Sequence, residues 1–332
     1  MPSPNVSQVH STTPLTNVAV AYMQDHDNFI ADKVFPVVSV KHQSDLYYKW
    51  NKDDFFRDEA QIRADGSESA GSGVDLTTDS YAAKVWALHK DIGDQMRANA
   101  DPAVDLATSI SEYLMQKLLL RRDRLFASNY LTTGKWGTDI TGTASTSDAT
   151  HTIQWSDDAT SDPFTDIANQ QTTILQNTGM MANTLTLGWQ VYQALRKHPL
   201  VIDRVKYTMQ ADAKNITPEL LASAFDVEKV VVAKASYNSA KKGAAGAYSF
   251  AVGKVALLSY APPAPSLMIP SAGYIFGWDG LEGQNSLGIS SWTEPVPNRG
   301  KPGSTTRVEA EMAFDMKLVG ADLGVFFTSI VA

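Results

Sequence analysis

Apolar residues recur at three- and four-residue spacing from Val104 to Phe126, a pattern that predicts a long helix with one buried face. Asp101 suits the N-cap and Pro102 the first helical position, so we predict the helix over residues 101–131. At 1.5 Å per residue it would be ~45 Å long, whereas a compact chain of this size has a radius of gyration of ~20 Å. We therefore expect this helix to be the spine of the molecule.

A second pattern precedes the helix and predicts a hairpin. Residues 41–62 carry aromatic side chains among charged ones: Tyr47, Tyr48, Trp50, Phe55 and Phe56. The turn-rich stretch RADGSESAGSG (63–73) follows, and residues 74–92 return as a strand. A two-stranded ribbon is marginal in water and has no core of its own, so we predict that a neighbouring subunit covers these aromatics, rather than that they form a local core.

The rest of the chain predicts a mixed α+β fold. We expect an extended arm over the first 20 residues, a short helix over 18–30 and an edge strand over 34–40. Residues 132–162 predict a loop with short strands, and Pro163 and Gly179 bound a helix. Strands and helices then alternate from about 180 to 300, with Thr217 capping one helix. Finally, Val308, Ala310, Met312 and Phe314 alternate with polar residues, as in a half-buried strand.

Composition narrows the functional classes. The chain has 332 residues, of which 43% are hydrophobic and 19% charged, and its formal net charge is −8. This acidic balance argues against tight binding to phosphates, and we expect it to limit sticking to any nucleic acid that the protein encloses. The absence of cysteine excludes disulfides and thiol chemistry and fits cytosolic synthesis. We expect neither a secretory signal nor a membrane-spanning segment.

Candidate chemistry is sparse. The six histidines lack metal-ligand spacing, and the acidic pairs lie in polar segments (Asp53 with Asp54, Asp58 with Glu59, Asp157 with Asp158). There is no nucleophile elbow and no phosphate-binding glycine loop, so we predict no catalytic, metal or cofactor site. Arg121, Arg122 and Arg124 lie late in the spine helix. They could contact an enclosed polyanion or a neighbour, or form a solvated stripe that favours the C-terminal dipole of the helix.

The order of these parts resembles the major capsid proteins of tailed bacteriophages, whose shell fold is the Hong Kong 97 type. The matching stretches are IADKVFPVVSVKHQSDLYYKW, TLTLGWQVYQALRKHPLVIDRVKYT and GKVALLSYAPPAPSLMIPSAGYIFGW, within a likeness that covers most of the chain. The resemblance implies an N-terminal arm (1–40), an extended E-loop hairpin (41–90) and a P-domain (91–180) with the spine helix at 101–131. It further implies an A-domain (181–303) and C-terminal strands of the P-domain (304–332).

By the same resemblance, the chain is expected to assemble into pentamers and hexamers of an icosahedral head in the host cytoplasm and to remain in the virion. It would enclose double-stranded DNA without reading its sequence. Its partners would be further copies of itself, a scaffolding protein and a portal protein, with a decoration protein as an optional one. The likeness begins near Met1, so we expect a separate scaffolding protein and little cleavage. Lys49 and Lys52 lie in the hairpin without an aligned partner, so we expect no isopeptide cross-link.

Three alternatives stay open at this point. An encapsulin-like nanocompartment would have the same shell fold but would enclose protein cargo. A soluble hydrolase with a long substrate loop would need a convergent nucleophile, acid or base. A tail or adhesion β protein is disfavoured by the long spine helix.

Overall fold

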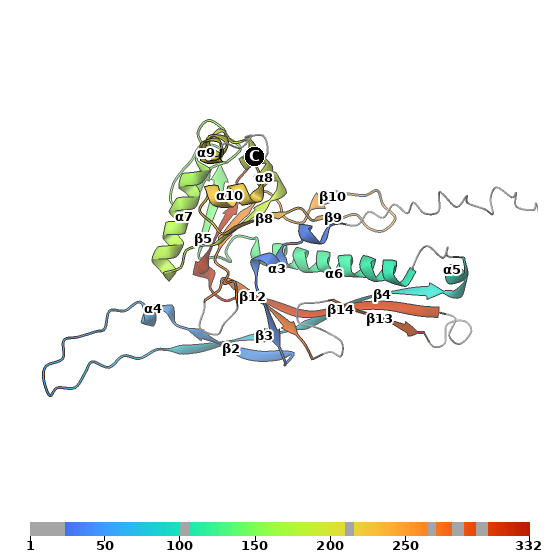
Figure 1. Cartoon of the computed structure of the whole chain (residues 1–332), viewed down its shortest axis with the longest axis horizontal. Helices are drawn as coiled ribbons and strands as arrows, with labels where there is room; N and C mark the ends of the chain where they lie inside the picture. The colour runs from blue at the N-terminus through green and yellow to red at the C-terminus, as the bar shows by residue number, and fades with distance from the viewer. Residues whose placement is uncertain (1–23, 100–105, 210–215, 265–269, 281–288, 297–304) are drawn as a thin grey trace, which may run out of the picture.

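The computed structural model describes residues 24–99, 106–209, 216–264, 270–280, 289–296 and 305–332. The predictions for the first residues of the arm, and for Asp101 and Pro102 at the start of the spine helix, lie outside these ranges. Within them the chain forms two packed units and a projecting hairpin (Figure 1).

The predicted spine is present as α6 (Leu106–Tyr130), a helix of 25 residues. Its buried residues, among them Leu114, Leu118 and Phe126, share a core with a five-stranded sheet. The sheet consists of β1 (Val37–Val40), β12 (Gly273–Trp278), β14 (Thr305–Leu318), β13 (Ser290–Pro295) and β4 (Lys84–Gly93).

Strand β14 is the centre of this sheet, because β4 pairs with its residues 305–314, β13 with residues 306–311 and β12 with residues 314–318. Its alternation was predicted correctly: Val308, Ala310, Met312 and Phe314 are all buried. The short β1 follows Pro36 and lies at the sheet edge, parallel to β12, as the proline predicts. Figure 1 shows α6 lying along β4 and β14.

The second unit is a six-stranded sheet with helices packed around it (Figure 1). In order, its strands are β6 (His151–Ile153), β5 (Thr138–Thr143), β15 (Gly324–Thr328), β11 (Ala256–Ser259), β7 (Thr184–Gly188) and β8 (Lys229–Ala233). The helices are α7 (Pro163–Thr178), α8 (Trp189–Lys197), α9 (Pro199–Met209) and α10 (Pro218–Ala224). Every residue of β7 and β11 is buried, so this sheet is the centre of a second core.

Local signals explain the ends of these helices. The Asp162 carboxylate accepts the backbone N–H groups of Phe164 and Thr165, at 3.1 and 3.2 Å, and so caps α7. At the other end Gly179 takes a left-handed conformation with φ 68°. Thr217 caps α10, as predicted. One helix was missed: Pro199 ends α8 but also begins α9, since a proline fits the first turn of a helix.

The hairpin consists of β2 (Ser44–Trp50) and β3 (Leu76–Ala82), paired in antiparallel register over seven residues, with the short helix α4 (Lys52–Phe55) after β2. The single returning strand expected over 74–92 is instead two strands. The chain leaves the ribbon at Ala83, and β4 then pairs with β14. A second, smaller ribbon is made of β9 (Ser236–Asn238) and β10 (Tyr248–Phe250), and α5 (Asp94–Ala98) follows β4.

The helix expected up to Ile30 is wrong in its described part. Residues 24–30 contain only the 3-10 turn His26–Asn28, and the separate helix α3 (Ala31–Val34) begins after it. The reason is a distant side chain: Asp123 on α6 accepts the N–H groups of Ile30 and Ala31 and so fixes a new helix start there. The turn before β15 is a second 3-10 turn, Ala321–Leu323.

Candidate assembly surfaces

The base of the hairpin is anchored to the spine sheet by aromatic contacts. The rings of Tyr47 and Tyr81 lie 5.4 and 4.7 Å from the ring of Phe276 on β12. The Tyr47 hydroxyl donates to the Asp79 carboxylate across the ribbon, at 3.0 Å. Burial, followed by this acceptor, raises the pKa of Tyr47 above its usual value. Tyr47, one of the five aromatics predicted to face a neighbour, therefore packs largely within its own chain.

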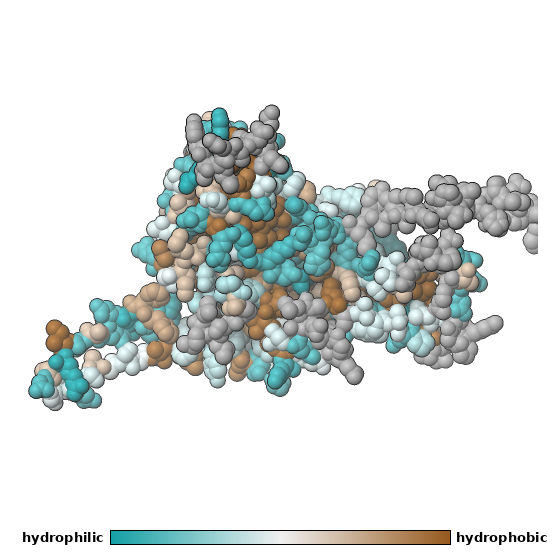
Figure 2. Space-filling model, in the orientation of Figure 1, coloured by the Kyte–Doolittle hydropathy of each residue, from teal (hydrophilic) through white to brown (hydrophobic). Residues whose placement is uncertain are grey.

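The other four predicted aromatics are exposed. Tyr48, Trp50, Phe55 and Phe56 leave 64%, 41%, 55% and 59% of their surface accessible. Trp50 and Phe55 meet edge to face at 6.1 Å, so they form one apolar surface. Figure 2 shows apolar and hydrophilic residues interspersed along this projecting part of the molecule.

The sequence analysis did not single out three more exposed apolar residues of the hairpin, Leu46, Ile62 and Leu76. The alternation of Leu46, Tyr48 and Trp50 at two-residue spacing could have identified the first of them, since such residues share one face of a strand. Trp50 is paired with Leu76 in the ribbon. We define the apolar hairpin face as Leu46, Tyr48, Trp50, Phe55, Phe56 and Leu76.

The loop beyond the ribbon is closed at its neck by one acidic side chain. The Asp54 carboxylate accepts the Asn51 side-chain amide at 3.2 Å and the backbone N–H of Asp75 at 3.0 Å. Arg57 pairs with the same carboxylate at 3.5 Å. Lys52 is paired with Asp322, so the neck is also tied to the body of the molecule. The loop therefore leaves the body from a fixed point.

The three arginines of the spine helix have different environments. Arg122 is buried and pairs with Asp32 of α3 at 2.7 Å. Arg121 lies over the ring of Trp86 at 4.6 Å, and Arg124 over that of Tyr237 at 4.1 Å. The structure thus gives Arg122 a role inside the chain, whereas Arg121 and Arg124 are exposed and available to a partner.

A buried carboxylate next to Arg122 was not anticipated from the sequence. Asp123 is 1% exposed, and its two oxygens accept the N–H groups of Ile30 and Ala31 at 2.9 to 3.0 Å. Burial raises the pKa of this carboxyl to about 6, although the amide donors and Arg122 act in the opposite direction. Two consecutive residues of α6 therefore hold α3. Asp123 binds the N–H groups at the N-terminus of α3, and Arg122 forms an ion pair with Asp32 of α3. We call this arrangement the arm clamp.

The pair nearest to hydrolase chemistry is Ser161 with His198, whose Oγ and Nε2 atoms lie 3.0 Å apart. Both side chains are buried, and His198 Nδ1 has no hydrogen-bond partner among the described residues. Burial lowers the pKa of His198. A triad would need a carboxylate on Nδ1 and access for substrate, so this pair is a packing contact between the C-cap of α8 and the loop before α7. In the described part of the chain, no cluster of three metal-ligating side chains is present, and no helix is long and apolar enough to cross a membrane.

Comparison with solved structures establishes the fold. The chain is similar to a phage-related protein from Bordetella bronchiseptica RB50, with 23% identity, a TM-score of 0.66, and coverage of 92% of this chain and 93% of that one. It is also similar to the capsid of cyanophage P-SCSP1u, with 12% identity, a TM-score of 0.61, and coverage of 98% and 94%. No protein-family model matches the sequence.

One curated relative is a capsid protein. The chain is 26% identical over 233 residues to the major capsid protein of Burkholderia phage BcepMu, a match that covers 68% of this chain and 70% of that protein. The sequence similarity to this capsid protein and the fold shared with a phage capsid therefore agree. The predicted resemblance to the major capsid proteins of tailed phages is thereby confirmed. A virus-like particle from Pyrococcus furiosus matches more weakly, with 10% identity, a TM-score of 0.51, and coverage of 89% and 90%.

Proposed function

We propose that this chain is a major capsid protein, copies of which assemble, as pentamers and hexamers, into an icosahedral head around double-stranded DNA. The observation that carries this proposal is the apolar hairpin face, which projects from the body and is left exposed by its own chain. A projecting surface that meets a different patch on the next copy makes a heterologous contact, and such contacts close into rings and shells when their rotations match.

The free energy of this contact depends on the apolar side chains that it would bury. Burying one Leu or Phe side chain is worth roughly 1.5–3 kcal/mol, and the apolar hairpin face contains six partly exposed apolar residues. Much of this free energy offsets the entropy lost on association, so a single contact should be modest. Each subunit would give one hairpin and receive another, and multivalency makes the sum large.

The parts implied by the resemblance can be assigned to the structure as proposals. We propose a shorter E-loop than the expected 41–90, namely the ribbon and its loop (residues 41–83), since β4 pairs with β14 in the spine sheet. The P-domain would be α6 with that sheet, and the A-domain would be the six-stranded sheet with α7 to α10. Compared with the expected ranges, this moves β5, β6, α7 and β15 to the A-domain, and β12 and β13 to the P-domain. The arm would end at α3, where the clamp holds it.

The test is assembly of hairpin variants. We expect Tyr48→Ser/Phe55→Ser to remain a folded subunit by circular dichroism but to form no closed shells in negative-stain electron microscopy. The matched control is Lys49→Ser, which changes an exposed polar residue of the same strand. Shells of normal diameter from the double variant would show that the apolar hairpin face is not the contact.

The contents of purified particles distinguish a phage head from an encapsulin-like nanocompartment. We expect purified particles to hold nuclease-protected DNA, and a portal protein at one vertex; particles filled only with protein cargo would favour the nanocompartment. The scaffolding, portal and decoration partners stay predictions. Co-expression with a candidate scaffolding protein should raise the yield of closed shells if such a partner directs assembly.

A further inference from the structure

The charge of this chain is unevenly distributed, and one part of it is strongly basic. Residues 229–278 contain five lysines and no aspartate or glutamate, although the whole chain has a net charge of −8. Two of these lysines, Lys241 and Lys242, are exposed in the loop between β9 and β10. The expectation that acidity keeps the whole protein away from phosphates therefore does not apply to this ribbon.

The exposed face of the spine helix is also basic. Lys117, Arg121 and Arg124 lie at i, i+4 and i+7 on α6, and so share one face of the helix. Each cation lies over an aromatic ring, at 4.1 to 5.3 Å from its centroid. In the part of the chain that the structure describes, none of the three is paired with a carboxylate. Ring stacking leaves the N–H groups at the edge of a guanidinium free to donate.

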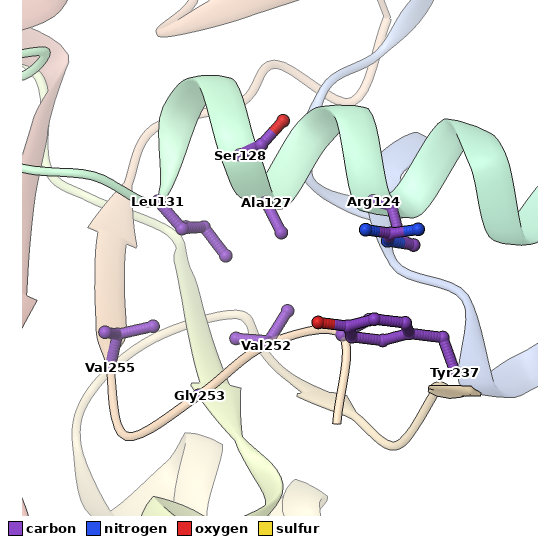
Figure 3. Close-up of a pocket in the computed structure, with 9 residues that line it drawn as sticks. Arg124, Ala127, Ser128, Leu131, Tyr237, Val252, Gly253 and Val255 are labelled. Atoms are coloured by element: carbon purple, nitrogen blue, oxygen red, sulfur yellow. The ribbon is translucent and has the colours of Figure 1, made fainter. Parts of the chain in front are cut away.

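One contact brings the helix and the ribbon together. Arg124 points from α6 toward the ring of Tyr237 on β9, beside a cavity of about 220 Å³ lined by both residues (Figure 3). The side chain of Gln24 also binds the backbone of Ser236, next to Tyr237. Asp27, three residues after Gln24, is paired with Lys33. We define the basic face as Lys117, Arg121, Arg124, Lys241 and Lys242.

We propose that the basic face lines the inside of the shell and binds the phosphate backbone of the enclosed double-stranded DNA. This inference rests on the proposed function and adds to it the surface that meets the genome. Five cations on one helix and one loop fit a polyanion of regular charge spacing, and stacked arginines with flexible lysines give affinity without sequence readout. The contact should be weak for one subunit and become effective through the many copies in a shell.

The test measures DNA binding by unassembled subunits across a salt series, by fluorescence anisotropy with a labelled 20-base-pair duplex. Each phosphate that is neutralised contributes about −0.9 to the slope of log K against log salt, so we expect Lys241→Gln/Lys242→Gln to reduce the slope by about 2. Arg124→Gln should reduce it by about 1. The matched control, Lys197→Gln/Lys206→Gln, removes two exposed lysines from α8 and α9 and should leave the slope unchanged.

An equal slope for the wild type and the loop variant, or an equal loss in the control, would overturn the proposal. So would a wild-type subunit that does not bind the duplex, because the face would then belong to a protein partner. Electron microscopy of the same variants separates this outcome from the proposed function. If Lys241→Gln/Lys242→Gln forms shells of normal diameter, the proposed assembly function holds, whatever the result of the DNA-binding measurement.

Discussion

The arm clamp predicts a pH dependence of stability that can be worked out from Asp123. The folded-state pKa of about 6 lies above the ordinary value of 3.8, because burial disfavours the charge. The extra stability from this group is therefore complete below about pH 4 and is lost as the pH rises through 6. About 2 pKa units correspond to ~3 kcal/mol in total, of which ~2 kcal/mol falls between pH 4.5 and pH 7.5.

Asp123→Asn removes the titration but keeps one oxygen that can accept the N–H groups of Ile30 and Ala31. The free energy of unfolding of the wild type, minus that of the variant, should therefore fall by ~2 kcal/mol from pH 4.5 to pH 7.5. The groups that face this carboxyl are Arg122, which lowers its pKa, and Asp32, which raises it.

The assay is urea unfolding of unassembled subunits at several pH values, followed by tryptophan fluorescence. The control variant Glu112→Gln removes one charge from the exposed face of the same helix. It shows how much the pH dependence of the free energy of unfolding changes when an exposed carboxylate is lost. Hydrogen exchange at residues 30–31, corrected for intrinsic rate, should show weaker protection at pH 7.5 than at pH 5 in the wild type only. A wild-type-minus-variant difference that stays constant, or that grows with pH, would refute the reasoning.

Three further substitutions test the packing. Phe35→Ala removes a buried ring that meets three other aromatic rings at 5.1 to 6.3 Å, and should lower the free energy of urea unfolding by about 3–5 kcal/mol; a loss below 1 kcal/mol would contradict this role. Gly188→Ala would place a Cβ 1.9 Å from the Gly253 carbonyl oxygen and should give insoluble protein, whereas Gly253→Ala meets nothing within 4 Å and should stay soluble. Asp162→Ala removes the cap of α7 and should cost about 1 kcal/mol, seen as a lower thermal midpoint that Asp162→Asn largely restores.

Features with local causes could be predicted from the sequence. The spine helix follows from apolar spacing, α7 from Pro163 and Gly179, and the burial of β14 from strict alternation. The apolar hairpin face was partly predictable because a two-stranded ribbon cannot cover its own aromatics. Each of these depends on residues within a few positions of one another.

Features that depend on residues far away in the chain could not be predicted from the sequence. Nothing near Ala83 shows that the returning arm will leave the ribbon, because the partner of β4 lies more than 200 residues later in β14. The start of α3 depends on a carboxylate 93 residues away. Tyr47 and Tyr48 are adjacent in sequence, yet the first packs on Phe276 and the second is exposed. The strand β15 also joins the six-stranded sheet from the far end of the chain.

The position of the last strands has a consequence for synthesis. Strand β14 is central in one sheet, and β15 lies between β5 and β11 in the other. While a ribosome is still translating, both sheets lack their middle, even though most of their other strands have already emerged. The five-stranded sheet cannot be completed until residue 318 has left the exit tunnel, and the six-stranded sheet cannot be completed until residue 328 has left it. Nascent chains on one messenger, although crowded together, therefore cannot present complete sheets to one another before both strands have emerged.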